Sequence, residues 1–177
     1  MGIFGEASVV SIAGFILTVV SFIIHLIGFA SPFWSYISTP RFKSSLGLWQ
    51  VCATEDEQTT CESLSCDGVN AELQWCTSAW KAAQAFEILG LLTLIAAVVL
   101  ISLKMFQFQD RTILKLAGIC CCFIGGVFIL IGVIVYGTQE GIVEKSSFHF
   151  AFVFCIVAAI GSVIAAILLF IGDRLSK

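Results

Sequence analysis

Charged residues are scarce in this chain of 177 residues, in which Asp, Glu, Lys and Arg together make up only 12%. A soluble domain carries about 25%, so the chain has few of the groups that hold a protein surface in water. No run of basic residues could follow a phosphate backbone, and we therefore predict no nucleic-acid partner. The single asparagine, Asn70, is followed by Ala-Glu, so the sequence contains no N-glycosylation sequon.

Motifs that carry chemistry are also missing. We find no pairing of a nucleophile with a base, and no Cys-x-x-Cys motif with histidine partners. We therefore predict that the protein is not an enzyme and that it holds neither a metal nor another cofactor. The short tail after Ile171 ends in Lys177 and offers no ligand for a PDZ groove, which takes an extended C-terminal strand.

What the chain does have is long apolar runs, since 59% of its residues are hydrophobic. Roughly 20 apolar residues span a bilayer as a helix. Backbone groups left unpaired in lipid cost several kcal/mol each, so such runs must be helical. We predict one membrane domain, an all-α bundle of four transmembrane helices at residues 9–30, 82–103, 116–136 and 148–171.

Charge placement predicts the orientation of these spans. The loop at residues 104–115 has three basic residues against one acidic residue, whereas the long loop at residues 31–81 has three basic residues against six acidic ones. Lys and Arg close to the membrane prefer the cytoplasmic side. We therefore place both termini in the cytoplasm, and the long loop and the short loop at residues 137–147 outside, in a multi-pass protein of the plasma membrane.

The long loop is the one long polar segment, and it holds four of the eight cysteines. Pro32 ends the first span, and Phe33–Ile37 is the start of a strand. Residues 40–47 are expected to form a loop, followed by strands at Leu48–Thr54 and Thr59–Leu64. This hairpin brings Cys61 opposite Cys52.

Four cysteines outside the membrane allow three pairings. We favour Cys52–Cys61 with Cys66–Cys76, because each pair closes a short local loop. An oxidising compartment outside the cell would allow these disulfides.

Polar residues within the spans are candidates for function. Lys81 marks the outer boundary of the second span, and Gln84 and Glu87 follow it as a possible intramembrane polar site. Glu87 could instead hydrogen-bond to a neighbouring helix or face a hydrated crevice. For His25 we expect a side chain satisfied inside the bundle or near the headgroups, rather than a proton or metal site.

Small residues recur every fourth position on two spans, which lets helices approach closely. They are Gly118, Cys122 and Gly126 on the third span, and Ala158, Ser162 and Ala166 on the fourth. The triplet Cys120–Cys122 could carry palmitate near the cytoplasmic side, but we favour buried packing because it lies inside the span.

The loop resembles the first extracellular segment of the claudin/peripheral-myelin-protein superfamily. The shared features are a Trp after the first span, a Gly-Leu-Trp motif and two later cysteines, here Trp34, Gly47, Leu48, Trp49, Cys52 and Cys61. The resemblance covers essentially the whole chain. It implies a left-handed four-helix bundle with a small extracellular antiparallel β-sheet of about five strands, clamped by Cys52–Cys61 and anchored to the helix ends by Trp34 and the Gly-Leu-Trp segment.

The sequence departs from this family pattern at several positions. Gln84 replaces an arginine that is typical of claudins, with Lys81 as a substitute for its charge, and Glu87 stands where the family has an aliphatic residue. Cys66 and Cys76 look like a second clasp and resemble the channel-associated members. These are the regulatory proteins of AMPA receptors and the gamma subunits of calcium channels.

Two functions are consistent with this resemblance. In the first, the sheet binds the same protein in its own and the facing membrane, at cell–cell contacts, as a paracellular barrier or membrane organiser. The acidic segment Glu55-Asp56-Glu57 could then favour cations, although an acidic turn also keeps a strand edge soluble. In the alternative, the protein is an auxiliary subunit of an ion channel or ionotropic receptor.

Overall fold

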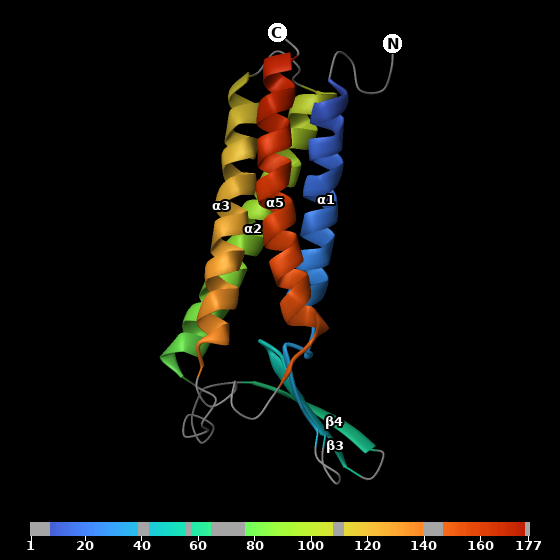
Figure 1. The fold of residues 1–177 in the computed structure, drawn as a ribbon, viewed down its shortest axis with the longest axis vertical. Coiled ribbons are helices and arrows are strands. Elements are labelled where there is room, and N and C mark those ends of the chain that lie inside the picture. The colour runs from blue at the N-terminus through green and yellow to red at the C-terminus, as the bar shows by residue number, and fades with distance from the viewer. Residues whose placement is uncertain are drawn as a thin grey trace.

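The computed structural model describes residues 8–38, 43–55, 58–64, 77–107, 112–139 and 147–175. Four long helices lie along one common axis (Figure 1): α1 Val9–Ala30, α2 Ser78–Phe106, α3 Thr112–Gly137 and α5 Phe150–Leu175. Each is long and apolar enough to cross a membrane. The predicted four-helix membrane bundle is confirmed.

Helices α2 and α3 extend at both ends beyond the apolar runs that predicted them, and α5 extends at its C-terminal end. The first helix has the expected bounds, but α2 begins at Ser78 rather than at residue 82, because the Thr77 side chain accepts a hydrogen bond from the Trp80 amide at 3.1 Å and caps the helix. At its other end α2 continues past Lys104 to Phe106. An apolar run ends at the first charged residue, whereas the helix continues through Lys81 and Lys104.

Many large apolar side chains of the helices point outward. The buried positions of α1 are all small or polar: Ser11, Gly14, Thr18, Ser21, His25 and Gly28. Large aliphatic side chains such as Ile16, Leu92 and Ile134 are about half exposed or more. A water-soluble bundle would bury these residues, so this distribution fits a surface that lies in lipid.

The predicted small-residue faces of α3 and α5 meet in the bundle. All six predicted residues on these two faces are buried. A methyl group added to Gly126 would lie 2.5 Å from the Ser162 hydroxyl, and the Cys122 thiol donates to the carbonyl of Ser162 at 3.2 Å. Close backbone approach therefore depends on the small residues at these positions.

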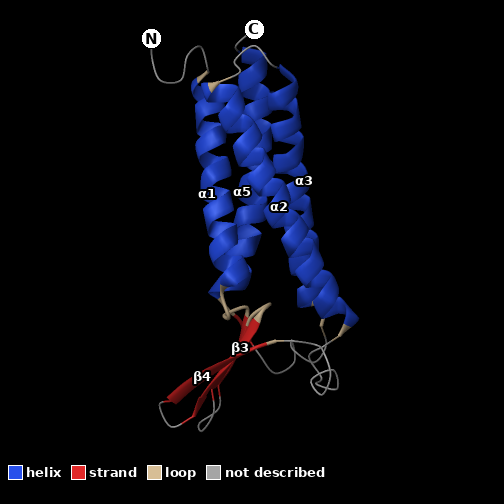
Figure 2. Cartoon of the chain, turned by 180° about the vertical axis from the view of Figure 1, so that it is seen from behind, coloured by secondary structure: helices blue, strands red, loops and turns tan. Residues whose placement is uncertain are grey.

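The helices associate in two pairs, α1 with α5 and α2 with α3. Figure 2 shows that the two pairs diverge toward the end of the bundle where the sheet lies. At the opposite end, α1 begins and α5 ends, and the Ser8 hydroxyl donates to the carbonyl of Gly172 at 3.0 Å. The first and last helices are thus joined at the end that lies away from the sheet.

Five antiparallel strands form the predicted sheet: β1 Ser35–Ser38, β2 Lys43–Leu46, β3 Gln50–Glu55, β4 Gln58–Ser63 and β5 Ser147–Phe148, in the order β4-β3-β2-β1-β5. Two expectations were wrong. Residues 43–46 form a strand inside the expected loop, because β2 pairs with both β1 and β3. Phe148 belongs to β5 rather than to the last helix, because it pairs with Ser35.

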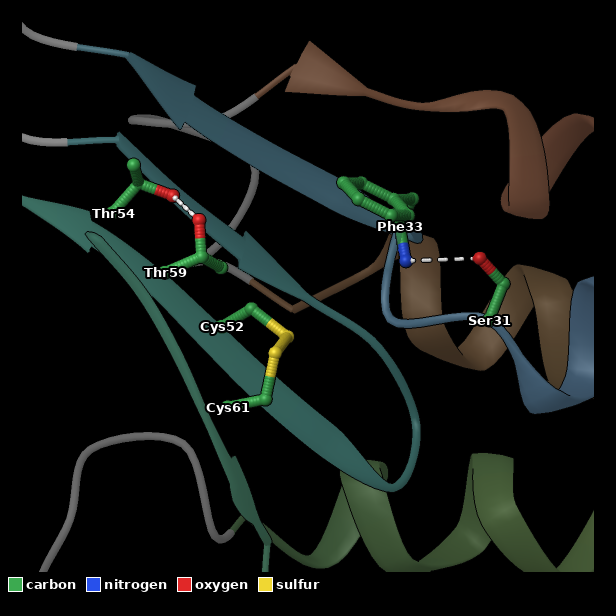
Figure 3. The surroundings of a disulfide bond; sticks show 6 residues. All are labelled: Ser31, Phe33, Cys52, Thr54, Thr59 and Cys61. Atoms are coloured by element: carbon green, nitrogen blue, oxygen red, sulfur yellow. Dashed lines mark hydrogen bonds between the residues drawn. A yellow bond between two sulfur atoms is a disulfide. The ribbon is translucent and has the colours of Figure 1, made fainter. Parts of the chain in front are cut away.

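The predicted Cys52–Cys61 disulfide is present and joins β3 to β4 (Figure 3). The two residues face each other in the strand register. Beside them, the hydroxyls of Thr54 and Thr59 lie 3.0 Å apart across the same strands. The second predicted pair, Cys66–Cys76, lies outside the described residues.

Replacing Cys52 with serine should destabilise the sheet by about 2–3 kcal/mol, because the disulfide closes a short loop and restricts the unfolded chain. We expect reduced delivery to the cell surface, measured by surface biotinylation, and the same for Cys61→Ser. A matched control is Cys120→Ser, since this cysteine is free and exposed on α3. Normal delivery of both hairpin variants would show that the disulfide does not hold the sheet together.

Candidate functional site

Trp34 forms the centre of the junction between sheet and helices. Its side chain is 0% exposed, and its indole N–H donates to the carbonyl of Gly28, at the end of α1, at 2.8 Å. The ring packs against Tyr136 from α3 and Phe152 from α5, with centroids 4.9 and 5.9 Å away. The residue directly before β1 therefore contacts three helices.

The Gly-Leu-Trp segment makes the second connection. Leu48 is fully buried, and its carbonyl accepts a hydrogen bond from the Gln84 side chain on α2 at 2.7 Å. The Trp49 ring packs on Phe29 of α1 with centroids 5.1 Å apart. Gly47 lies so close to the chain leaving α1 that an added methyl would be 2.5 Å from Pro32 Cα. The motif thus anchors the sheet at the helix ends.

Lys81, Gln84 and Glu87 do not form one site. Lys81 is exposed, and Gln84 supports the sheet through Leu48. Glu87 lies deeper and is 0% exposed. Its carboxylate lies among groups from other helices instead.

Glu87 belongs to a buried cluster of three side chains that can bind a metal or a proton. His25 of α1 and Cys155 of α5 bring their ligand atoms to it, and all three groups lie within 4.8 Å of one another. His25 Nδ1 and Glu87 Oε2 are 3.6 Å apart, which is too long for a hydrogen bond. On α3, a methyl added to Gly132 would lie 2.6 Å from Glu87 Oε1, so this glycine makes room for the carboxylate.

The polar atoms of His25 and Glu87 lack hydrogen bonds to the described residues, although the two side chains face each other at 3.6 Å. Both ring nitrogens of His25 and both carboxylate oxygens of Glu87 are buried without a hydrogen bond to any described residue. We expected a His25 side chain satisfied inside the bundle or near the headgroups; it is buried inside the bundle beside Glu87, without a hydrogen bond to the described residues. Cys155 was missed, because it is far from the other two in sequence. Its depth could have indicated it, since His25 lies five residues before the end of α1 and Cys155 five residues after the start of α5.

The cysteine triplet on α3 divides among three environments. Cys120 is exposed, Cys121 is partly buried and Cys122 is fully buried against Thr18 and Ser162. The expected packing role therefore holds for Cys122. Palmitoylation of the outward-facing Cys120 stays a prediction.

These features define a class of protein: a four-span membrane protein with a disulfide-clamped sheet at one end of its helix bundle. The chain belongs to the lipoma HMGIC fusion partner-like family. The family model with the description "Lipoma HMGIC fusion partner-like protein" matches residues 10–141. The match includes His25, Glu87 and the Gly-Leu-Trp segment, whereas Cys155 lies beyond it. No curated protein sequence matches the chain at a significant level.

Proposed function

We propose that this protein is an auxiliary subunit that binds a larger channel or receptor within the same plasma membrane. The observation that carries this proposal is the direct attachment of the sheet to the helices. Buried contacts through Trp34 and Leu48 make sheet and bundle one body. A neighbour in the same membrane can therefore contact both parts at once, and the free energies of the two contacts add in one interface.

We further propose that the sheet lies outside the cell and both termini inside. In support, the helix ends that carry the termini lie together at the end opposite the sheet (Figure 1), and residues 31–81 are net acidic whereas residues 104–115 are net basic. The Cys52–Cys61 disulfide agrees, since disulfides persist in oxidising compartments. An epitope tag at either terminus should bind antibody only after the cells are permeabilised.

The surface of the sheet favours a partner of different sequence. All six residues of β4 are exposed and polar or cysteine, and β4 is an edge strand. Such an edge can add a strand or loop from a partner ectodomain. The surrounding loop carries six acidic residues against three basic ones, so two copies placed loop to loop would repel each other. A partner with a basic ectodomain surface would attract it instead.

A second candidate is the cell-contact role implied by the resemblance to the claudin superfamily. The observation that favours it is the reach of the β3–β4 hairpin, which extends away from the helices at the far end of the molecule (Figure 1). A protein in the facing membrane would meet this hairpin first. Neither role requires catalysis, and we propose none.

Affinity purification in mild detergent distinguishes the two candidates. We expect a channel or receptor subunit to copurify, and Glu62→Arg on the exposed edge strand to reduce its recovery at least about tenfold, through loss of charge complementarity. The matched control is Lys104→Glu, which reverses a charge at the opposite end of α2 and should leave recovery unchanged.

Recovery of the protein alone from several cell types would argue against an auxiliary subunit. Enrichment at contacts between transfected cells, with changed transepithelial resistance, would then support the second candidate. A uniform surface distribution with unchanged resistance would argue against that candidate as well.

A further inference from the structure

We propose that His25, Glu87 and Cys155 form a transition-metal site, with Zn²⁺ as its preferred ion. The site lies inside the bundle toward its sheet end, since His25 is five residues before the end of α1 and Cys155 is five residues after the start of α5. The two helix pairs diverge toward this end (Figure 2). Its ligands come from α1, α2 and α5. This role is separate from the proposed binding of a membrane partner.

The geometry of the three groups is close to that of a tetrahedral site. Zinc binds nitrogen, oxygen and sulfur ligands at about 2.0–2.3 Å, which places neighbouring ligand atoms about 3.3–3.8 Å apart. His25 Nδ1 and Glu87 Oε2 are already 3.6 Å apart. All ligand atoms lie within 4.8 Å of one another. Side-chain movements of about 1 Å would therefore bring the Cys155 sulfur to the distance at which it can bind the same ion as the other two ligands.

The absence of other partners supports a ligand role. A buried polar atom without a hydrogen bond costs about 1–3 kcal/mol, and more if it is charged. Here two ring nitrogens and two carboxylate oxygens share this condition within one cluster of described residues. Side chains that only tolerate burial would be expected to bond to one another or to the backbone, as Gln84 does with Leu48.

The charges and atom types of the three ligands indicate which class of ion would bind. A divalent ion with one carboxylate and one thiolate gives a neutral centre, which suits an interior of low dielectric constant. The mixed nitrogen, oxygen and sulfur set is typical of Zn²⁺, whereas Ca²⁺ and Mg²⁺ take oxygen ligands and Cu⁺ favours softer sets. Binding releases to solvent the thiol proton of Cys155 together with any proton held by the Glu87 carboxyl, and a fourth position stays open for water or another ligand.

The consequence is a bridge between the helix pairs. His25 and Cys155 belong to the pair α1–α5, and Glu87 belongs to the pair α2–α3. Bound metal would fix the separation of these pairs just below the sheet. The site therefore couples metal binding to the geometry of the sheet end of the molecule.

The test uses the full-length protein, purified in mild detergent and stripped with a chelator. Co²⁺ should bind with one equivalent per chain and give visible bands of a tetrahedral centre, together with an ultraviolet thiolate-to-Co²⁺ charge-transfer band. Zn²⁺ should displace it. At a free concentration of about 100 times its dissociation constant, Zn²⁺ should raise the thermal midpoint by about 5–10 °C.

Three variants and a control identify the ligands. Cys155→Ala should lose the charge-transfer band, and His25→Gln and Glu87→Gln should each weaken Co²⁺ binding at least about 100-fold, which is at or above the loss typical of a residue that only supports a ligand. The control Cys122→Ala removes another fully buried free thiol and should keep the full spectrum.

Glu87→Gln preserves shape, so it provides a folded reference if another variant fails to give a monodisperse protein. An unchanged charge-transfer band in Cys155→Ala would overturn the proposal, as would unchanged Co²⁺ affinity in a monodisperse Glu87→Gln protein. Substoichiometric binding by the wild type would do the same. If the wild-type protein binds Co²⁺ as expected but no channel or receptor subunit copurifies with it, the result counts against the proposed function and leaves the metal site standing.

Discussion

Replacing Gly47 with alanine is expected to destabilise the protein by about 3 kcal/mol and to remove most of it from the cell surface. The added methyl would lie 2.5 Å from Pro32 Cα and 2.5 Å from the carbonyl oxygen of Ser31. Overpacking typically costs about 1–3 kcal/mol, and backbone atoms cannot rotate away as a side chain can. The sheet would have to move away from the end of α1.

Gly137→Ala is the matched control for this prediction. A methyl there would meet only ring atoms of Phe152 and Phe148, at 3.7 and 3.9 Å, which is ordinary contact. We expect normal surface biotinylation and an unchanged thermal midpoint. Equal behaviour of the two alanine variants would mean that the approach of Gly47 to the helix end is not a constraint on folding.

Replacing Trp34 with alanine is expected to cost about 3–5 kcal/mol, as is typical for a large buried aromatic residue. The side chain is 0% exposed and packs on Tyr136 and Phe152. We also expect the sheet to detach from the bundle before the helices separate. Hydrogen exchange should therefore show faster exchange of the strand amides than of the helix amides.

The same change to phenylalanine at both tryptophans removes the same ring atoms, so comparing the two variants helps to separate the hydrogen bond from the loss of packing. Trp34→Phe removes the indole donor to Gly28 and should cost about 1–3 kcal/mol. Trp49→Phe removes a buried indole N–H that has no partner among the described residues, so it should be close to neutral. A larger loss of thermal stability for Trp49→Phe than for Trp34→Phe would contradict this assignment.

The spans and their number could be predicted because lipid imposes a strong constraint. An apolar run of sufficient length must satisfy its backbone as a helix, and this holds whatever the run packs against. The Cys52–Cys61 pair was also accessible, since a hairpin places the two residues opposite each other. Trp34 and the Gly-Leu-Trp segment were located through family resemblance, and the structure supplied their contacts.

Strand β2 could not be predicted in the same way. Lys43–Leu46 contains two serines and a lysine and has little intrinsic preference for a strand. It forms because β1 and β3 pair with its two edges. Such pairing depends on the tertiary position of distant segments, which local sequence does not encode.

Only part of the buried cluster could be recognised from the sequence, for a related reason. Glu87 attracted attention because an acid within a span is expensive. Its nearest groups come from α1 and α5, which lie 62 and 68 residues away along the chain, at His25 and Cys155. Counting residues from the helix ends shows which residues share one depth, but only the packing of the helices shows which of them face one another.

The pairing of α1 with α5 sets the order in which the protein can mature during synthesis. The helix made first presents Ser11, Ser21 and His25 toward α5, which is made last. Strand β5, which completes the sheet against β1, precedes α5 directly. Until the ribosome has released the final span, the first span holds polar groups that α5 does not yet cover, and β5 lacks the helix that follows it. Truncation before Phe150 should therefore leave a chain that the quality control of the secretory pathway recognises as unfinished.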